Sequence, residues 1–349
     1  MTARPPTPSE AWQTHTTINC SDKIQLQKKQ TRIVMKEQHE ESVSVSVAGL
    51  QIEIRAVGCR LTDVGFRGFG TPRPSRSWMP PPTDIIVVTL TQWSNINDGA
   101  KANARFVSPK NGEDGCEWAL QSNEDGTETI TARYDNGPLK AAQVTYTATN
   151  AQLRVEPAER HASTIDPYIF PIFNIFLSRQ LLRRGGFLIH SSVVCTGIGK
   201  GMLFTAPSGT GKSTIAELFR KDRAVVINDD MVAVRPPETE GGEPRAYSIP
   251  MRNYKQKPSS TTLRGVYLLH QAPENTLARI KSKAEAMAAI MANVIQQPLN
   301  EESVSQLTSN VFLCFGNVDT SHLGFEPSGA VVKLLRGTMS ARAKKGGDH

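Results

Sequence analysis

Alternation of apolar and polar residues dominates the first half of the chain. Serine and valine alternate strictly over Ser42–Val47. Further runs with a period of two follow at residues 51–55, 84–90, 127–134 and 142–148. The dipeptides Asp125-Gly126 and Asn136-Gly137 between these runs are typical of hairpin turns. The pattern predicts a mainly antiparallel β domain over residues 42–160. Residues 1–41 are rich in Pro, Thr, Gln and Lys and are predicted to form a disordered polar tail.

The hydrophobic period changes from two to that of a helix after this region. Apolar residues at helical spacing predict a helix over Pro167–Arg184 that buries one face and ends at the pair Gly185-Gly186. Two strand-like runs follow, Phe187–Val194 and Gly201–Thr205, and only Thr196–Lys200 lies between them. A parallel crossover needs about a dozen residues. The two strands are therefore predicted to form an antiparallel hairpin.

The signals that follow alternate between strands and helices. A buried strand at Ala224–Asn228 ends in Asp229-Asp230, and residues 263–270 have the pattern of another strand. A capping-box pattern at Ser282 opens a helix, a second helix is predicted over residues 306–315, and residues 331–335 are predicted to form a closing strand. Together these elements predict an α/β domain with a mixed sheet over residues 161–338, followed by a disordered basic tail at 339–349.

A phosphate-loop pattern lies between the second strand of the hairpin and the next helix. Its residues, which would bind a nucleotide, are Ala206, Pro207, Ser208, Gly209, Thr210, Gly211, Lys212, Ser213 and Thr214. Glycines let the main chain curl so that successive N–H groups point at phosphate oxygens, and the helix N-terminus adds unpaired donors. Lys212 can reach the terminal phosphates, and the Ser213 hydroxyl can ligate Mg²⁺. Ala206 stands where glycine is usual, which a small residue tolerates if its φ is negative. The alternative is an ordinary turn before a helix, which the strand–loop–helix context disfavours.

Other polar residues could take part in phosphate chemistry. Asp229 and Asp230 end a hydrophobic strand that follows the loop helix, where one carboxylate could hold Mg²⁺ and the other could accept a hydroxyl proton. A solvated turn is the alternative. His190 lies in the strand that pairs with the one feeding the loop, although a lone histidine in a strand is usually a core residue. Arg252 and Arg264 flank a stretch whose cations could neutralise charge on a γ-phosphate, with surface solvation as the alternative.

Charge and cysteine usage exclude several function classes. The net charge is +7, with 40 Lys and Arg against 33 Asp and Glu, but no dense basic stripe with interleaved aromatic residues points to nucleic acid. The five cysteines are scattered and never spaced as a C-x-x-C pair, so neither a disulfide framework nor a zinc site follows and a reducing cytosol is expected. No apolar run is long enough to span a bilayer, so no membrane is expected as a partner.

Three segments, taken in order, resemble the catalytic domain of HPr kinase/phosphorylase. They are Leu188-Ile-His190, Ala206–Ser213 and Ile227-Asn-Asp-Asp230. The helix end Arg183-Arg-Gly-Gly186, just before the first of them, is similar to that of HPr-kinase-like proteins with a variable N-terminal β region. The resemblance covers roughly residues 166–337. It implies a mixed-sheet P-loop kinase domain of the type shared with phosphoenolpyruvate carboxykinases, preceded here by the β domain, and it suggests a homo-oligomer.

The resemblance also implies roles for the candidate residues. The loop would bind ATP, Ser213 and Asp230 would hold Mg²⁺, Asp229 would be the base toward a serine hydroxyl, and His190 would lie near the transferred phosphate. The implied activity is an ATP- and Mg²⁺-dependent kinase that phosphorylates a serine of a small protein or peptide. The Glu-x-Arg-Gly-x-Gly signature linked to phosphorolysis is incomplete, because Thr262 and Tyr267 replace its first and last residues. Phosphorolysis is therefore not expected.

Alternative functions stay open at this point. The chain could be an accessory protein that binds or hydrolyses ATP without an acceptor, or a small-molecule enzyme of the phosphoenolpyruvate-carboxykinase type. Against the second, the sequence lacks a rich set of metal-ligating His, Lys and Asp residues. Transporter-type ATPases have the same residue pattern in their phosphate loop, but this chain contains no Leu-Ser-Gly-Gly-Gln motif.

Overall fold

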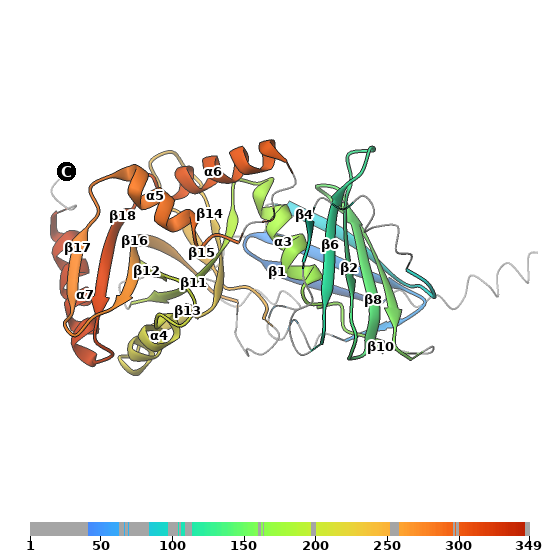
Figure 1. Cartoon of the computed structure of the whole chain (residues 1–349), viewed down its shortest axis with the longest axis horizontal. Helices are drawn as coiled ribbons and strands as arrows, with labels where there is room; N and C mark the ends of the chain where they lie inside the picture. Colours follow the sequence, from blue (N-terminus) through green and yellow to red (C-terminus); the bar gives the residue numbers. More distant parts are fainter. Residues whose placement is uncertain are drawn as a thin grey trace, which may run out of the picture. The chain divides into compact units, whose positions relative to one another are not determined.

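The computed structural model describes residues 41–62, 66, 69, 84–96, 104, 106–108, 114–159, 162, 164–196, 200–251, 258–295, 297 and 300–345. Of the tail predicted at residues 1–41, only Glu41 lies within these ranges. The described strands form two eight-stranded sheets and one two-stranded sheet, shown in Figure 1. The protein is a mixed α/β structure with both parallel and antiparallel pairing, as the sequence predicts.

The N-terminal sheet has parallel strands at its centre. Its strands are β1 (Glu41–Val47), β2 (Leu50–Val57), β4 (Asp84–Gln92), β5 (Phe106–Val107), β6 (Glu117–Ser122), β7 (Glu128–Arg133), β8 (Leu139–Tyr146) and β9 (Asn150–Pro157). They lie in the order β1-β2-β4-β9-β8-β7-β6-β5. β2 and β9 both run parallel to β4, and the other pairings described for this sheet are antiparallel. The parallel centre was not predicted. β3 (Arg60–Leu61) and β10 (Thr164–Ile165) form a separate parallel pair.

Alternation along β1 and β2 produces one buried face, as the sequence pattern predicts. Val45 lies opposite Ile52 in the ladder, and both side chains are fully buried. Because side chains in a strand point alternately to opposite faces, these apolar residues share the face that packs into the core with α3 (Ile172–Leu182). Edge-to-face aromatic contacts complete this core, such as Tyr146 with Phe176, whose ring centroids are 5.1 Å apart.

Helix α3 is buried on every side. All of its residues from Ile172 to Leu182 are buried, so the prediction of a helix with one buried face is wrong. One side contacts β7 and β8 of the N-terminal sheet, and another contacts β11 and α6 of the C-terminal region (Figure 1). The helix ends near Gly185, which has a φ of 78°. A positive φ is what glycine tolerates better than other residues.

The C-terminal sheet positions the candidate site. Its strands are β11 (Phe187–Cys195), β12 (Lys200–Thr205), β13 (Val225–Asn228), β14 (Met231–Arg235), β15 (Arg245–Tyr247), β16 (Ser260–Gln271), β17 (Thr276–Arg279) and β18 (Asp319–Phe325). The predicted hairpin is confirmed, because β11 and β12 pair antiparallel with Ser191 opposite Thr205. β12 also pairs in parallel with β16. The pairings β12-β11-β14-β15-β16-β12 therefore close a ring of strands.

The helices of the C-terminal region correct two predictions. They are α4 (Lys212–Lys221), α5 (Lys283–Met291), α6 (Glu301–Phe315) and α7 (Gly329–Lys345). The closing strand predicted at residues 331–335 is wrong, because this segment lies in α7. Its buried residues Val331, Val332 and Leu335 have helical spacing, and the strand in this region is β18 instead. Helix α7 also continues to Lys345, so the tail predicted at 339–349 is helical over residues 339–345.

The starts of α5 and α6 follow ordinary capping chemistry. The Ser282 hydroxyl accepts a hydrogen bond from the Glu285 main-chain N–H, as the capping-box pattern predicts. Helix α6 begins five residues earlier than predicted, where the Asn300 side chain accepts from the Ser303 N–H at 2.9 Å. None of the helices in the described part of the chain has the length and apolarity needed to cross a bilayer.

Candidate functional site

The phosphate-loop pattern folds as a turn between β12 and α4. Gly209 has a φ of 80° and Gly211, the N-cap residue of α4, has a φ of 113°. Both values fall where glycine is favoured, so the loop geometry requires these residues. The Thr210 hydroxyl donates to the Pro207 carbonyl at 2.9 Å and braces the turn. Ala206 is buried and is not among the described non-glycine residues with positive φ, so it fits the place where glycine is usual.

Lys212 reaches back across the loop from the first turn of α4. Its Nζ donates to the Ala206 carbonyl at 2.8 Å and to the Pro207 carbonyl at 3.0 Å. The residue is buried, with a relative exposure of 6%. Burial lowers the pKa of Lys212, and the nearby Asp230 carboxylate acts in the opposite direction. The ammonium is thus held over the loop and lies close enough to Asp230 for their charges to interact.

Asp229 and Asp230 lie between two strands that pair with the same edge of β11. β13 pairs with β11 up to Asn228, and β14 pairs with it from Met231. The main chain of the acidic pair is held from two elements. The Asp229 carbonyl accepts from the Ser213 hydroxyl of α4 at 3.4 Å and from the Ser192 hydroxyl of β11 at 3.3 Å. The predicted loop and the predicted acids are therefore neighbours in the structure.

The Asp229 carboxylate carries an unpaired oxygen. Its Oδ1 is buried and has no hydrogen-bond partner among the described residues. Burial raises the pKa of Asp229, the cation Arg220 on α4 lowers it, and the neighbouring Asp230 raises it. An unpaired, desolvated carboxylate has a free acceptor for a metal ion or a proton. Asn228 was not predicted as part of the site, yet its Oδ1 accepts from the Asp229 N–H at 2.8 Å.

His190 lies on β11 with its side chain partly buried. Its Nε2 is 3.7 Å from Asp230 Oδ1, which is longer than a hydrogen bond. Its carbonyl accepts a hydrogen bond at 2.9 Å from the hydroxyl of Thr205, which is the last residue before the loop. Burial lowers the pKa of His190, the charge of Lys212 lowers it further, and Asp230 raises it. The imidazole is therefore neutral near pH 7 and faces the acidic pair.

Of the two arginines considered for the γ-phosphate, only Arg264 is described, and it lies away from this site. Arg252 lies outside the described residues. Arg264 forms an ion pair with Glu243. In the β12–β16 ladder the neighbours of Arg264 pair with Gly201 and Met202, whereas the loop begins after Thr205. At about 3.3 Å per residue, Arg264 is separated from the loop by most of the length of β12.

Within the described part of the chain, no group of three or more His, Cys, Asp or Glu could hold a metal ion on its own. Mg²⁺ does not require such a group, because it is usually bound through one or two carboxylates together with water and substrate phosphates. The residues present fit that pattern. Asp229 has an unpaired oxygen, the Asp230 side chain is 41% exposed, and the Ser213 hydroxyl contacts the Asp229 carbonyl.

Comparisons with known proteins give a weak structural likeness. No family model matches the sequence, and no curated protein matches it. Among solved structures, the chain is similar to the HPr(Ser) kinase/phosphatase from Coxiella burnetii, with 12% identity and a TM-score of 0.27. The match covers 45% of this chain and 97% of that chain. A TM-score this low does not establish a shared fold, so the residues of the chain carry the functional argument.

Proposed function

We propose that the protein is an ATP- and Mg²⁺-dependent phosphotransferase that acts on a serine hydroxyl of a small protein or peptide. One observation carries this proposal: the glycine loop, Lys212 and the acidic pair Asp229-Asp230 lie together at one end of the C-terminal sheet. The order of the same segments in the sequence resembles that of HPr-kinase-like proteins, which supports a protein or peptide as the acceptor.

The loop is suited to bind phosphate groups. Its main-chain N–H groups precede the N-terminus of α4, where unpaired donors and the helix dipole favour an anion. Lys212 would exchange its two carbonyl acceptors for phosphate oxygens when a nucleotide binds. The exchange keeps the ammonium hydrogen-bonded throughout, so the cost of freeing it from the loop carbonyls is offset by charge-assisted bonds to phosphate.

The acidic side of the site would hold the metal ion and the acceptor. Ser213 and Asp230 would bind Mg²⁺, which would neutralise phosphate charge when present. Asp229 would accept the proton of the serine hydroxyl, because burial has already raised its pKa and its Oδ1 is unpaired. The neutral His190 would lie near the transferred group without adding charge to it. Positioning and electrostatic stabilisation would thus account for most of the rate enhancement.

The test is phosphate transfer by the purified full chain. The protein is incubated with γ-labelled ATP, Mg²⁺ and the products of neighbouring genes, and label is followed into protein and into free phosphate. We expect a labelled protein or peptide acceptor with the wild-type chain, and loss of both signals in Lys212→Ala. Lys221→Ala is the matched control, because Lys221 is an exposed lysine at the other end of α4.

The outcomes separate the alternatives. Asp229→Asn should still bind ATP but lose transfer by a factor of about 100 or more, the usual contribution of a positioned general base. Free phosphate without a labelled acceptor would favour an ATPase or accessory role. Normal turnover in Lys212→Ala would show that the loop is not the nucleotide site and would refute the proposal.

A further inference from the structure

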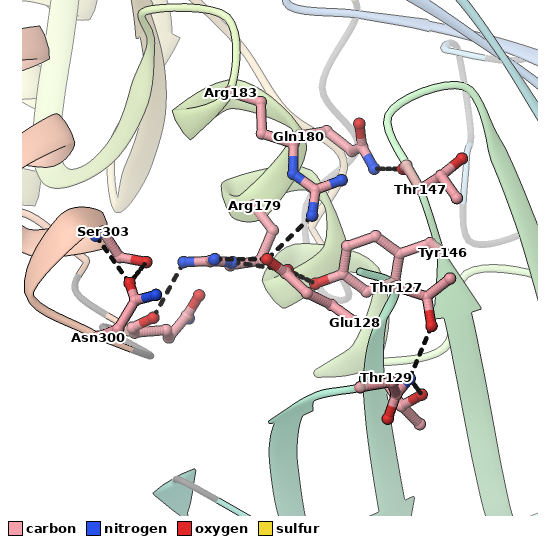
Figure 2. A network of polar contacts seen from close by, with 12 residues as sticks. Thr127, Glu128, Thr129, Tyr146, Thr147, Arg179, Gln180, Arg183, Asn300 and Ser303 are labelled. Carbon is pink, nitrogen blue, oxygen red and sulfur yellow. Dashed lines mark hydrogen bonds and ion pairs between the residues drawn. The ribbon is translucent and has the colours of Figure 1, made fainter. Parts of the chain in front are cut away.

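A buried carboxylate of the N-terminal sheet is held by two arginines, Arg179 of α3 and Arg183 at the C-cap of this helix. Glu128 at the start of β7 accepts from Arg179 Nε at 2.9 Å and from Arg179 Nη2 at 2.7 Å. Arg183 Nη2 lies 2.9 Å from the same carboxylate, and the Tyr146 hydroxyl donates to it at 2.7 Å. Figure 2 shows these side chains converging on Glu128. The carboxylate is therefore satisfied on both oxygens, although its side chain is only 10% exposed.

Arg179 also donates to a residue of the C-terminal region. Its Nη1 donates to the main-chain carbonyl of Gln297 at 3.2 Å. Gln297 follows α5, in the C-terminal region, whereas Glu128 belongs to the N-terminal sheet. A single planar guanidinium, whose donors have a fixed geometry, thus connects the two regions.

The residues just before Gln297 are paired with β11 at the candidate site. Ile189 forms an antiparallel bridge with Val294. The His190 N–H donates to the Asn293 carbonyl at 2.9 Å, and the Ile295 N–H donates to the Leu188 carbonyl at 2.9 Å. On this edge of β11, pairing with β12 begins only at Ser191. Residues 293–295 therefore supply the edge partner for the part of β11 that carries His190.

We propose that Arg179 is a positioning residue for His190. It fixes Gln297 through the Gln297 carbonyl, and residues 293–295, which come just before Gln297, hold the main chain of His190, while Glu128 holds Arg179 in place. For its catalytic consequence the inference rests on the proposed function. It gives the N-terminal β region a role in the site, because a change at Glu128 is transmitted to β11 through one guanidinium.

Packing leaves a gap beside Gln297. A cavity of about 20 Å³ lies beside it, lined by residues of α3, β11 and α6 together with Arg179 and Ile295. That volume is enough for about one water molecule. The side-chain Oε1 of Gln297 is buried and has no hydrogen-bond partner among the described residues. Within the described part of the chain, the hydrogen bond from Arg179 is thus the directional contact at this carbonyl.

Hydrogen exchange tests the inference without requiring turnover. The amides of His190 and Ile295 both donate across the segment–β11 pairing. In Arg179→Lys, which keeps the charge but loses the fork of donors, we expect both amides to exchange about tenfold faster, as loss of a charge-assisted hydrogen bond implies. Glu128→Gln should accelerate the same two amides. The Ile215 amide of α4, which donates to Gly211, reports on global stability, and the acceleration at His190 and Ile295 should exceed the acceleration at Ile215 by about tenfold.

Arg184→Lys is the matched control. Arg184 lies two residues after α3 and donates to the Ala148 carbonyl of the N-terminal region and to Gln180, whereas the donor to the Gln297 carbonyl is Arg179. This variant should leave the His190 and Ile295 amides unchanged. The inference is overturned if Arg179→Lys or Glu128→Gln leaves both amides at the wild-type rate, if all amides accelerate equally, or if Arg184→Lys has the same effect as Arg179→Lys.

Two further measurements keep the test decisive. If Arg179→Lys does not fold, the test uses Tyr146→Phe, which removes one donor to Glu128 and leaves both arginines in place. In Tyr146→Phe we expect about threefold faster exchange of the His190 and Ile295 amides. An unchanged exchange rate in this variant overturns the inference. In phosphate-transfer assays Arg179→Lys should lower kcat about tenfold and leave the KM for ATP within about twofold. If exchange changes as expected while the wild type transfers no phosphate, the proposed function fails and the structural link stands.

Discussion

Replacing Gly211 by alanine should damage the phosphate loop through two separate effects. Gly211 has a φ of 113°, which an L-residue with a side chain rarely adopts. A Cβ at this position would also lie 2.7 Å from Phe325 Cζ and 3.3 Å from Phe325 Cε1. Phe325 ends β18 and is buried in the core beside α4, so its ring cannot move aside freely. Gly209 has a φ of 80°, but a Cβ there would meet no atom within 4 Å.

The two glycines therefore separate backbone strain from steric overlap. A positive φ costs a residue with a Cβ about 1–2 kcal/mol. Overpacking of a tight core contact costs about 1–3 kcal/mol more. We expect Gly209→Ala to lose about 1–2 kcal/mol of the free energy of unfolding, and Gly211→Ala to lose about 2–5 kcal/mol.

A double-mutant cycle with Phe325→Leu isolates the overlap. Urea unfolding of the wild type, both single variants and the Gly211→Ala/Phe325→Leu double variant gives the coupling free energy, which should be about 1–3 kcal/mol in the direction of rescue. Phe325→Leu combined with Gly209→Ala is the control and should be additive within about 0.5 kcal/mol. The reasoning is refuted if Gly211→Ala costs no more than Gly209→Ala, or if the Gly211 cycle is as additive as the control.

Three further predictions concern buried groups. Glu128→Gln leaves the buried Arg179 without its counter-charge and should lower the free energy of unfolding by about 3–5 kcal/mol in urea at pH 7. Burial raises the pKa of Glu128, but the hydrogen bonds and charge of Arg179 outweigh burial and lower the pKa. The stabilisation from Glu128 is therefore present above the ordinary pKa of 4.5 and is lost as the pH falls below it. An equal loss at pH 3 and pH 7 would contradict this. Burial raises the pKa of Asp229, so its ionisation opposes folding as the pH rises; Asp229→Asn should therefore raise the melting temperature at pH 7, and the gain should shrink toward pH 4. A lower melting temperature at pH 7 would argue against a desolvated carboxylate. Burial raises the pKa of Cys314 to about 12, so mass spectrometry should find it unmodified by iodoacetamide at pH 8 in the folded protein and modified in urea; rapid modification without urea would show that it is accessible.

The parts of the fold that depend on short-range sequence could be predicted. The link between β11 and β12 is too short for a crossover, so the sequence alone determines that they form a hairpin. The loop before α4 has its shape because Gly209 and Gly211 provide positive φ and Thr210 braces the turn, all within a few residues. The closeness of Asp229 to the loop followed from the expectation that the strand before it would end beside that loop.

The parts that depend on tertiary contacts could not be predicted. Alternation in β2 and β4 shows which residues are buried but not whether the strands run parallel, because a period of two is the same in both cases. In α7 the largely apolar segment Val331–Leu335 resembles a strand, and only packing against the core reveals the helix. The sequence also gives no sign that the polar residues of α3 are buried. Arg179 has the pattern of a solvent-exposed position, and only the contact with Glu128, 51 residues earlier, shows that it is not.

The position of His190 explains why the site depends on distant residues. Its carbonyl accepts from Thr205, which leads into the phosphate loop, and its N–H donates to Asn293, four residues before the Gln297 carbonyl that Arg179 contacts. The residue lies where the edge partner of β11 changes from residues 293–295 to β12. Because β11 also pairs with the strands on either side of the acidic pair, a shift of its main chain would move His190 relative to both the loop and the acids. The phosphate loop therefore acts on His190 through its carbonyl, and the Glu128–Arg179 contact acts on it through its N–H. Loop variants and Glu128 or Arg179 variants should combine non-additively in transfer activity while remaining additive in stability.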